Sequence, residues 1–146
     1  NIADLMFNLE NSVDEKSLLF IGVALNSNNI KIYGNKNIVI SEVDFETLNN
    51  LGIQKKHTQN TDVANILHSV IGWDLAITFI ETEKDKISLS FRTRDYKKID
   101  VSKLALVLGG GGHKAAAGAT LKIPFEQARQ FLLDTIYSVY PDLKPA

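Results

Sequence analysis

The sequence predicts an α/β fold in which a small mixed β-sheet is flanked by helices and a Gly-rich loop joins a helix to a strand. Two spacings of apolar residues occur in turn along the chain, alternation at every second residue and helical stripes at every third or fourth. A run of four glycines at 109–112 interrupts this pattern near the C-terminal end. Helices and strands in mixed order bury their apolar faces by packing helices against one sheet.

The composition is that of one globular domain. Apolar residues make up 45% and charged residues 23% of the 146 residues. The absence of cysteine excludes disulfides, thiolate metal sites and a cysteine nucleophile. No apolar run reaches the roughly 18 residues of a membrane span, and no signal peptide is recognisable. We therefore expect a cytoplasmic protein without membrane partners.

The N-terminal end has the character of a connecting segment. The chain starts at Asn1, its only methionine is Met6, and residues 8–14 are polar. We expect residues 1–12 to be the tail of a preceding helix and a linker, and residues 13–146 to be one domain of a longer polypeptide.

The next segment predicts a helix and a hairpin. Ser12 and Glu15 have the spacing of a capping box, which favours a helix over residues 13–26. The apolar run within it also suits a buried strand. The segments 30–33 and 37–40 flank a Gly-Asn pair, which indicates a β-hairpin.

Two further helices follow the hairpin. A capping pattern at 41–44 predicts a short helix over 42–51. An apolar stripe predicts a second helix over 63–71, capped by Asn60 or Thr61 and ended by a glycine. The stripe consists of Val63, Ile66, Leu67, Val70 and Ile71.

A strand pair comes next, joined by a polar turn at 82–85. Two sets of side chains alternate along 75–80 and along 87–92. Because the apolar set of the second strand faces the core, its polar set shares the opposite face. Arg92 then stands at the end of a rigid strand and points away from the core. The polar set is Ser88, Ser90 and Arg92.

The C-terminal part alternates helix, strand and helix. Asp100 or Ser102 caps a helix that ends near Leu108. Residues 118–123 are predicted to form a strand, and Pro124 suits the start of the final helix. The buried stripe of that helix is Ala128, Leu132, Ile136 and Val139.

Positive charge gathers in one window. Residues 84–103 contain seven basic and three acidic side chains, although the net charge of the chain is −1. The window includes Arg92 and Arg94, and guanidinium groups suit bidentate binding of phosphate. The alternative interpretation of the window is an ordinary solvated surface.

The glycine run at 109–112 is the strongest chemical signal. Four consecutive glycines cost backbone entropy, so the run suits a place where the backbone approaches a ligand closely. Successive N–H groups can turn toward one anion, and His113 can donate a hydrogen bond to a phosphate oxygen. The run lacks the Gly-Lys-Ser/Thr ending of a P-loop and the preceding strand of a dinucleotide fingerprint. A flexible connector is the alternative.

These residues carry a family resemblance. Gly110-Gly111-Gly112-His113, followed by Ala116-Ala117-Gly118, resembles the G-G-G-H-x-x-A-A-G signature of the DHH-associated domain of the first subfamily. This is the C-terminal domain of the DHH phosphoesterases. Residues 88–93 resemble the family's strand ending in S-x-R-S/T, and residues 100–105 its D-V-S-x-I-A helix start. The resemblance covers residues 62–140 in the family's order.

The family resemblance implies a division of labour. An N-terminal domain holds two divalent metals, usually manganese, and the C-terminal domain grips the substrate. On the matching positions, Arg92 would bind a substrate phosphate and the backbone of 110–112 would border the nucleotide. His113 would contact the phosphate near the metals, and Lys114 would add charge beside it. Arg94 is a further candidate without a firm counterpart.

The metal ligands of the family are not found in the sequence. There is no Asp-His-His motif, and the three histidines are His57, His68 and His113. We interpret His57 as a solvated loop residue and His68 as a helix-flank residue. We predict no metal, no cofactor, no catalytic residue and no hydrolysis in this chain alone, since the manganese would belong to the N-terminal domain.

Residues 13–60 resemble the lead-in segment of the nanoRNase and phosphoadenosine-phosphate phosphatase group. We therefore expect the substrate-binding domain of a hydrolase acting on short oligoribonucleotides or phosphoadenosine phosphate. Its partners would be such a nucleotide or short oligonucleotide and the N-terminal DHH domain of the same polypeptide. The alternatives are a nucleic-acid-binding module, as in RecJ-type exonucleases or alanyl-tRNA synthetases, and a structural or oligomerisation domain. A homodimer stays open.

Overall fold

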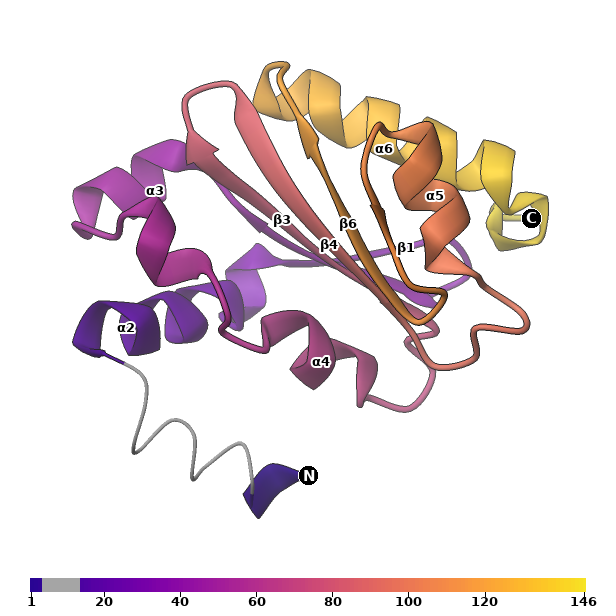
Figure 1. The fold of residues 1–146 in the computed structure, drawn as a ribbon, viewed down its shortest axis with the longest axis horizontal. Coiled ribbons are helices and arrows are strands. Elements are labelled where there is room, and N and C mark those ends of the chain that lie inside the picture. Colours follow the sequence, from indigo (N-terminus) through magenta and orange to yellow (C-terminus); the bar gives the residue numbers. More distant parts are fainter. Residues whose placement is uncertain (4–13) are drawn as a thin grey trace.

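The computed structural model describes residues 1–3 and 14–146, and the expected linker and the capping role of Ser12 lie outside these residues. The described part is a six-stranded mixed sheet between two layers of helices (Figure 1). This confirms the predicted fold class. One layer comprises α2 (Glu15–Ala24), α3 (Phe45–Asn50) and α4 (Val63–His68), and the other α5 (Val101–Val107) and α6 (Phe125–Val139).

The strands of the described residues lie in the order β1-β2-β3-β4-β6-β5. β2 and β3 are parallel, because the α3 and α4 segment crosses over between them, and the other neighbours are antiparallel. The strands are β1 (Ile30–Tyr33), β2 (Ile38–Val43), β3 (Leu75–Glu83), β4 (Lys86–Thr93), β5 (Gly111–Gly112) and β6 (Ala116–Leu121). Short 3₁₀ helices occur at Ser27–Asn29, Lys55–Thr58 and Pro141–Leu143.

Each face of the sheet has its own apolar core. On the α5–α6 face, alternate residues of β2, β3 and β4 pack against Leu104, Leu132 and Ile136, which are fully buried. On the α2–α4 face, Phe20 and Leu67 pack against the intervening residues of β2 and β3. Burial of each such side chain contributes roughly 1.5–3 kcal/mol. β4 sends apolar side chains to one face only, as its alternation predicts.

Three helices begin at an aspartate whose carboxylate accepts a backbone N–H of the first turn. The predicted helix over 13–26 is observed as α2 with Asp14 as its cap, and the predicted helix over 42–51 is the shorter α3 with Asp44 as its cap. Asp100 caps α5 as expected. The N–H donors are those of Ser17, Thr47 and Ser102, at 2.9, 2.8 and 3.0 Å.

The prediction for α4 was right about its first residue, Val63, but wrong about its cap and its last residue. Asp62, not Asn60 or Thr61, precedes the helix; its backbone is left-handed with φ +59°, and its side chain does not cap. The helix ends at His68, and Ile71 is 90% exposed. The apolar stripe therefore stops at Leu67, and the remaining residues form a surface turn.

The glycine run also differs from its prediction. Gly111 and Gly112 are not part of a loop but form the two-residue edge strand β5, paired with Gly118 and Ala117. β6 correspondingly begins at Ala116 and ends at Leu121, where a strand over 118–123 was predicted. The helix after Pro124 and the hairpin at 30–40 are confirmed.

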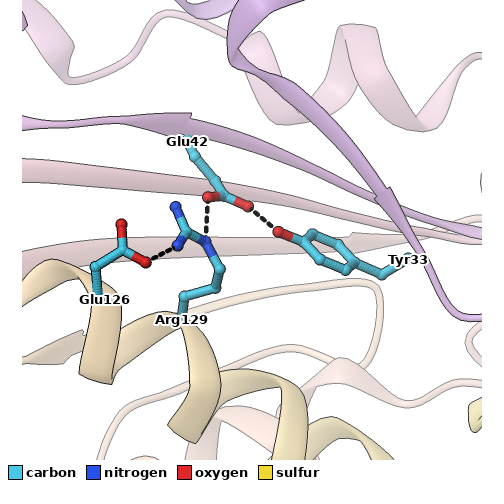
Figure 2. Close-up of polar contacts among 4 residues, drawn as sticks. All are labelled: Tyr33, Glu42, Glu126 and Arg129. Carbon is cyan, nitrogen blue, oxygen red and sulfur yellow. Dashed lines mark hydrogen bonds and ion pairs between the residues drawn. The ribbon is translucent and has the colours of Figure 1, made fainter.

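A buried carboxylate joins β1, β2 and α6 on the α5–α6 face of the sheet (Figure 2). Glu42 accepts the Tyr33 hydroxyl at 2.6 Å and Arg129 Nε at 2.6 Å. Arg129 also pairs with Glu126, and its guanidinium lies 5.2 Å from the centroid of the Phe125 ring. Burial, followed by the hydrogen bond to Glu42, raises the pKa of Tyr33. The Glu42 side chain is 2% exposed, so the Tyr33 hydroxyl and the Arg129 guanidinium take the place of water as its hydrogen-bond partners.

Candidate functional site

Polar and very small residues form one face of the sheet beside α4. Directly opposite residues in antiparallel strands share a face, so the register places Thr78, Ser90, Gly118 and Gly111 in one row across β3, β4, β6 and β5. The first two residues of this row carry a hydroxyl group, and the last two are glycines without a side chain. The neighbouring row runs from Ala76 through Arg92 to Ala116. Such a floor lets a ligand come close to the backbone toward the β5 edge.

A hollow of about 440 Å³ lies at the β3–β4 side of this floor. Its wall is the segment that leads into α4, and its floor comes from β3 and β4. The volume falls within the roughly 300–1,000 Å³ of small-molecule sites. The lining consists of residues 58–64 with Phe20, Thr78, Ile80, Ser88, Ser90 and Arg92.

Three hydroxyl groups on the floor of the hollow have no hydrogen-bond partner among the described residues. They belong to Thr78, Ser88 and Ser90, and no side chain in the described part of the chain has a polar atom that is both buried from solvent and unsatisfied. The three oxygens are therefore open to the hollow. Alternation along β4 put the two serines on this face, as predicted, whereas Thr78 was not singled out as a site residue.

Arg92 lies at the rim of the hollow with part of its guanidinium already held. Nε donates to Asn65 Oδ1 at 3.0 Å, and Nη1 donates to the carbonyl of Phe91 at 2.9 Å. Nη2 has no partner among the described residues. Partial burial lowers the pKa of Arg92, and the nearby Asp62 carboxylate opposes this shift. The guanidinium stays cationic and presents Nη2 to an anion.

The four glycines of the run differ in whether the fold requires the absence of a side chain. A Cβ on Gly110 would lie 2.0 Å from the carbonyl oxygen of Gly118, and one on Gly112 would lie 2.5 Å from Cα of Ala117. Gly109 has φ +84°. These three therefore serve the packing of β5 against β6 and the end of α5. A Cβ on Gly111 would meet nothing within 4 Å. Only at Gly111 does the fold leave the glycine unexplained.

The anion nest expected from the glycine run does not form. The N–H of Gly109 donates to Leu106, that of Gly110 to Ala105, and that of His113 to Ala116. These groups therefore satisfy backbone carbonyls rather than converging on one point. The sequence predicted that a ligand approaches the backbone closely at this run. In the structure, only the open surface at Gly111 still supports that prediction.

The turn between β5 and β6 places His113 and Lys114 at the Arg92 end of the sheet. The carbonyl of Lys114 accepts the N–H of Val101 at 3.0 Å, and the carbonyl of Ala115 accepts that of Thr93 at 3.3 Å. The turn is thereby fastened to α5 and to the residue after Arg92. Both side chains of the turn are exposed. The structure thus gathers Arg92, His113 and Lys114 at one end of β4 and β6.

Arg94 is directed elsewhere. Its Nη1 donates to the carbonyl of Val70 at 2.9 Å, with the carbonyls of His68 and Ser69 at 3.5 Å. These are carbonyls at the C-terminal end of α4, which have no partner within the helix. Arg94 therefore binds the end of α4 and does not line the hollow, whereas Arg92, which also contacts α4 through Asn65, does line it.

The interpretation of His57 was wrong. This side chain is 8% exposed rather than solvated, and its Nδ1 accepts the N–H of Gln54 at 2.8 Å, which closes the 3₁₀ helix at 55–58. His68 lies at the end of α4 and is half-buried. Among residues 1–3 and 14–146, no three His, Asp or Glu side chains are grouped as a metal ion would require. The described residues therefore do not fit a manganese site.

Sequence reasoning missed Asp62 and Asn65. Asn65 Nδ2 donates to Asp62 Oδ1 at 3.3 Å, and Asn65 presents its own oxygen to Arg92. The signal available in the sequence was a pair of polar residues at the predicted start of α4. Nothing in the sequence indicated that this helix would pack alongside Arg92.

The chain was compared with known proteins. The model of the DHHA1 domain matches residues 35–140. No curated protein matches. Among solved structures, an exopolyphosphatase-related protein from Bacteroides fragilis is similar with a TM-score of 0.76 and 23% identity, over 98% of this chain and 40% of that one. A pGpG-specific phosphodiesterase, PggH from Vibrio cholerae, is similar with a TM-score of 0.52 and 20% identity, over 87% of this chain and 40% of that one.

These two likenesses concern the fold. The chain spans 40% of the length of each of the two structures. In the described part of the chain, none of the helices combines the length and the apolar character needed to cross a membrane.

Proposed function

Because this chain belongs to the DHHA1 domain family, we propose that it is the substrate-gripping part of a metal-dependent DHH phosphoesterase. The substrates proposed are short oligoribonucleotides or phosphoadenosine phosphate. The observation that carries this proposal is the free Nη2 of Arg92 beside a backbone floor without side chains at Gly111 and Gly118. A phosphorylated ligand can lie on that floor and still reach the guanidinium.

In this proposal the residues of the chain bind and orient the substrate. Arg92 Nη2 donates to a phosphate oxygen, a charge-assisted hydrogen bond worth about 1.5–3 kcal/mol. Asn65 and the Phe91 carbonyl hold the guanidinium plane, so little side-chain freedom is lost on binding. His113 and Lys114 donate to the phosphate from the β5–β6 turn.

The bond-breaking step is assigned to another part of the polypeptide. The described residues hold no group suited to a metal, and the chain corresponds to 40% of each similar structure. We therefore propose that manganese and its ligands lie in an N-terminal DHH domain, and that this chain alone does not hydrolyse its ligand.

The test is a chemical-shift titration of the chain with phosphoadenosine phosphate and, separately, with a short oligoribonucleotide. Shifts are expected at Arg92 and at residues 110–114. The tighter of the two ligands identifies the substrate class, and a steep loss of affinity with added salt would favour a longer nucleic-acid track. If neither ligand moves these residues in the chain or in the full-length protein, the proposal is wrong.

A further inference from the structure

We propose that the hollow beside Arg92 receives the uncharged body of the phosphorylated ligand, in the form of one nucleoside. This inference rests on the proposed function for the placement of the phosphate at Arg92, and it adds a separate subsite. The hollow measures about 440 Å³ and begins at the same guanidinium. A phosphate held by Nη2 therefore brings whatever is esterified to it against the floor and wall of the hollow.

The lining of the hollow suits a neutral group that forms hydrogen bonds. The hydroxyls of Thr78, Ser88 and Ser90 have no partner among the described residues, so each can donate to and accept from a ligand. Among the described lining residues, Arg92 is the only cation and Asp62 the only carboxylate. A second phosphate inside the hollow would meet Asp62 and no further positive charge. The interior therefore disfavours a polyphosphate chain and favours a sugar or a base.

One side of the hollow is apolar. Phe20, Val63 and Ile80 contribute to its lining, and each is at most 4% exposed, so their surface toward the hollow is small and firmly packed. Polar groups that converge beside packed apolar side chains are typical of sites that bind small organic molecules. This pattern does not resemble the solvated basic surface that a bare phosphate chain would need.

The wall of the hollow is connected by hydrogen bonds to Arg92, the residue that would bind the phosphate (the phosphate grip). Asp62 precedes α4 but does not cap it; its Oδ1 instead accepts from Asn65, whose Oδ1 accepts from Arg92 Nε. Asp62 Oδ2 has no hydrogen-bond partner among the described residues and can accept a ribose hydroxyl or a base N–H. Asn60 and Asp62 both have left-handed backbones, with φ +56° and +59°. One hydrogen-bonded chain thus links the group that would contact the nucleoside to the group that would contact the phosphate.

The test separates the two parts of the ligand. The isotope-labelled chain is titrated with inorganic phosphate, tripolyphosphate, adenosine, guanosine and the two nucleoside monophosphates. We expect a monophosphate to bind at least about tenfold more tightly than phosphate, since two or three added hydrogen bonds amount to that factor. We also expect it to shift residues 59–64 and 88–90, which phosphate alone leaves in place.

Three variants sharpen the test. Ser90→Leu fills the hollow and is expected to reduce the affinity for the monophosphate to that for phosphate, while phosphate binding is unchanged. Thr78→Val removes one hydroxyl at nearly constant shape. It takes the place of Ser90→Leu if that variant does not fold, and it is expected to reduce the affinity for the monophosphate but not the affinity for phosphate. Thr120→Leu is the control, because Thr120 lies opposite Ser88 on the same face but outside the lining.

The outcomes distinguish this inference from the proposed function. If the monophosphates bind no better than phosphate and no nucleoside moves the hollow, the inference is overturned while the phosphate grip stands. If tripolyphosphate shifts the hollow more than a monophosphate does, the inference is overturned as well. If the nucleosides move the hollow and phosphate moves nothing, the inference holds and the phosphate grip fails. If no probe moves either region, both are wrong.

Discussion

Asn65 on α4 accepts a 3.0 Å hydrogen bond from Nε of Arg92 on β4. Arg94, two residues further along the same segment, donates to the carbonyl of Val70 just beyond the end of α4. The first turn of the short helix and the turn that follows the helix are therefore both bonded by arginines, Arg92 on β4 and Arg94 just after β4 ends. Only Arg92 keeps an unused guanidinium nitrogen next to the hollow, so the two arginines differ in what their removal would change.

Replacing Arg92 is expected to weaken ligand binding and to leave the fold intact. The loss for Arg92→Ala is about 1.5–3 kcal/mol, the value of a hydrogen bond to a charged group, or roughly tenfold to 150-fold in the dissociation constant. Calorimetric titration with phosphoadenosine phosphate measures it, and the melting temperature checks the fold. Lys31→Ala, at an exposed position on β1, serves as the control. Unchanged affinity in Arg92→Ala would remove Arg92 from the site.

Replacing Arg94 is expected to do the reverse. Arg94→Ala removes the side-chain donor of the Val70 carbonyl, which keeps only the N–H of Trp73 at 3.2 Å, and the free energy of unfolding should fall by about 0.5–1.5 kcal/mol. The affinity for phosphoadenosine phosphate should change by less than about twofold, a difference below 0.5 kcal/mol. Urea unfolding and the same titration measure the two quantities. A large loss of affinity with normal stability would return Arg94 to the ligand site.

Neighbouring glycines provide a matched pair. Gly110→Ala should destabilise the protein by about 1–3 kcal/mol, the cost of overpacking, because its Cβ would collide with the Gly118 carbonyl. Gly111→Val should leave stability nearly unchanged and impair binding, because its side chain would extend over the floor where the ligand lies. Thermal unfolding and ligand titration of both variants test this. Normal binding by Gly111→Val would show that the ligand does not approach β5.

Because it pairs with the buried Glu42 carboxylate, Arg129 is expected to contribute to the free energy of unfolding. Arg129→Met removes the cation from a carboxylate that is 2% exposed, and breaking such a pair costs up to about 3–5 kcal/mol. Glu126→Gln is the control, because Glu126 is 78% exposed and a surface pair contributes about 0–1 kcal/mol. Chemical unfolding measures both. Equal effects of the two substitutions would mean that Glu42 does not rely on Arg129.

The aspartate caps predict loss of stability in acid. The hydrogen bond from Ser17 lowers the pKa of Asp14, and that from Ser102 lowers the pKa of Asp100, below the ordinary value of 3.8. A carboxylate whose pKa is lower in the folded state stabilises the fold above its unfolded pKa. That contribution disappears as the pH falls through the folded pKa. Melting temperatures should therefore drop below about pH 4, and Asp100→Asn should have a flatter profile there. An identical profile would contradict the role of this cap.

Local patterns predicted most of the fold, because they are set by neighbours in the sequence. The alternation along 86–93 placed Ser88, Ser90 and Arg92 on one face, and the helix starts at Asp100 and Pro124 were recognisable from their residue types. What could not be predicted depends on contacts between distant segments. His57 is buried because the 55–58 turn lies against the core.

The glycine run shows the same limit at the site. Its composition indicated a close approach of the backbone, but the partner that Gly110 and Gly112 approach is β6 of the same chain. Gly111 could be separated from its neighbours only once the pairing of β5 with β6 was known. Asp62 and Asn65 joined the site for a similar reason, since α4 reaches Arg92 through tertiary packing.

The position of Arg92 on β4 determines how rigid the candidate site is. Phe91, the preceding residue, is fully buried between β3 and β6, so this part of β4 can open only when the core itself unfolds. Amide hydrogens of β4 should accordingly exchange among the slowest in the protein. The spacing between Ser88, Ser90 and Arg92 is then already fixed before any ligand arrives. Ligands would be recognised by a preorganised template, with little conformational entropy lost by the floor on association.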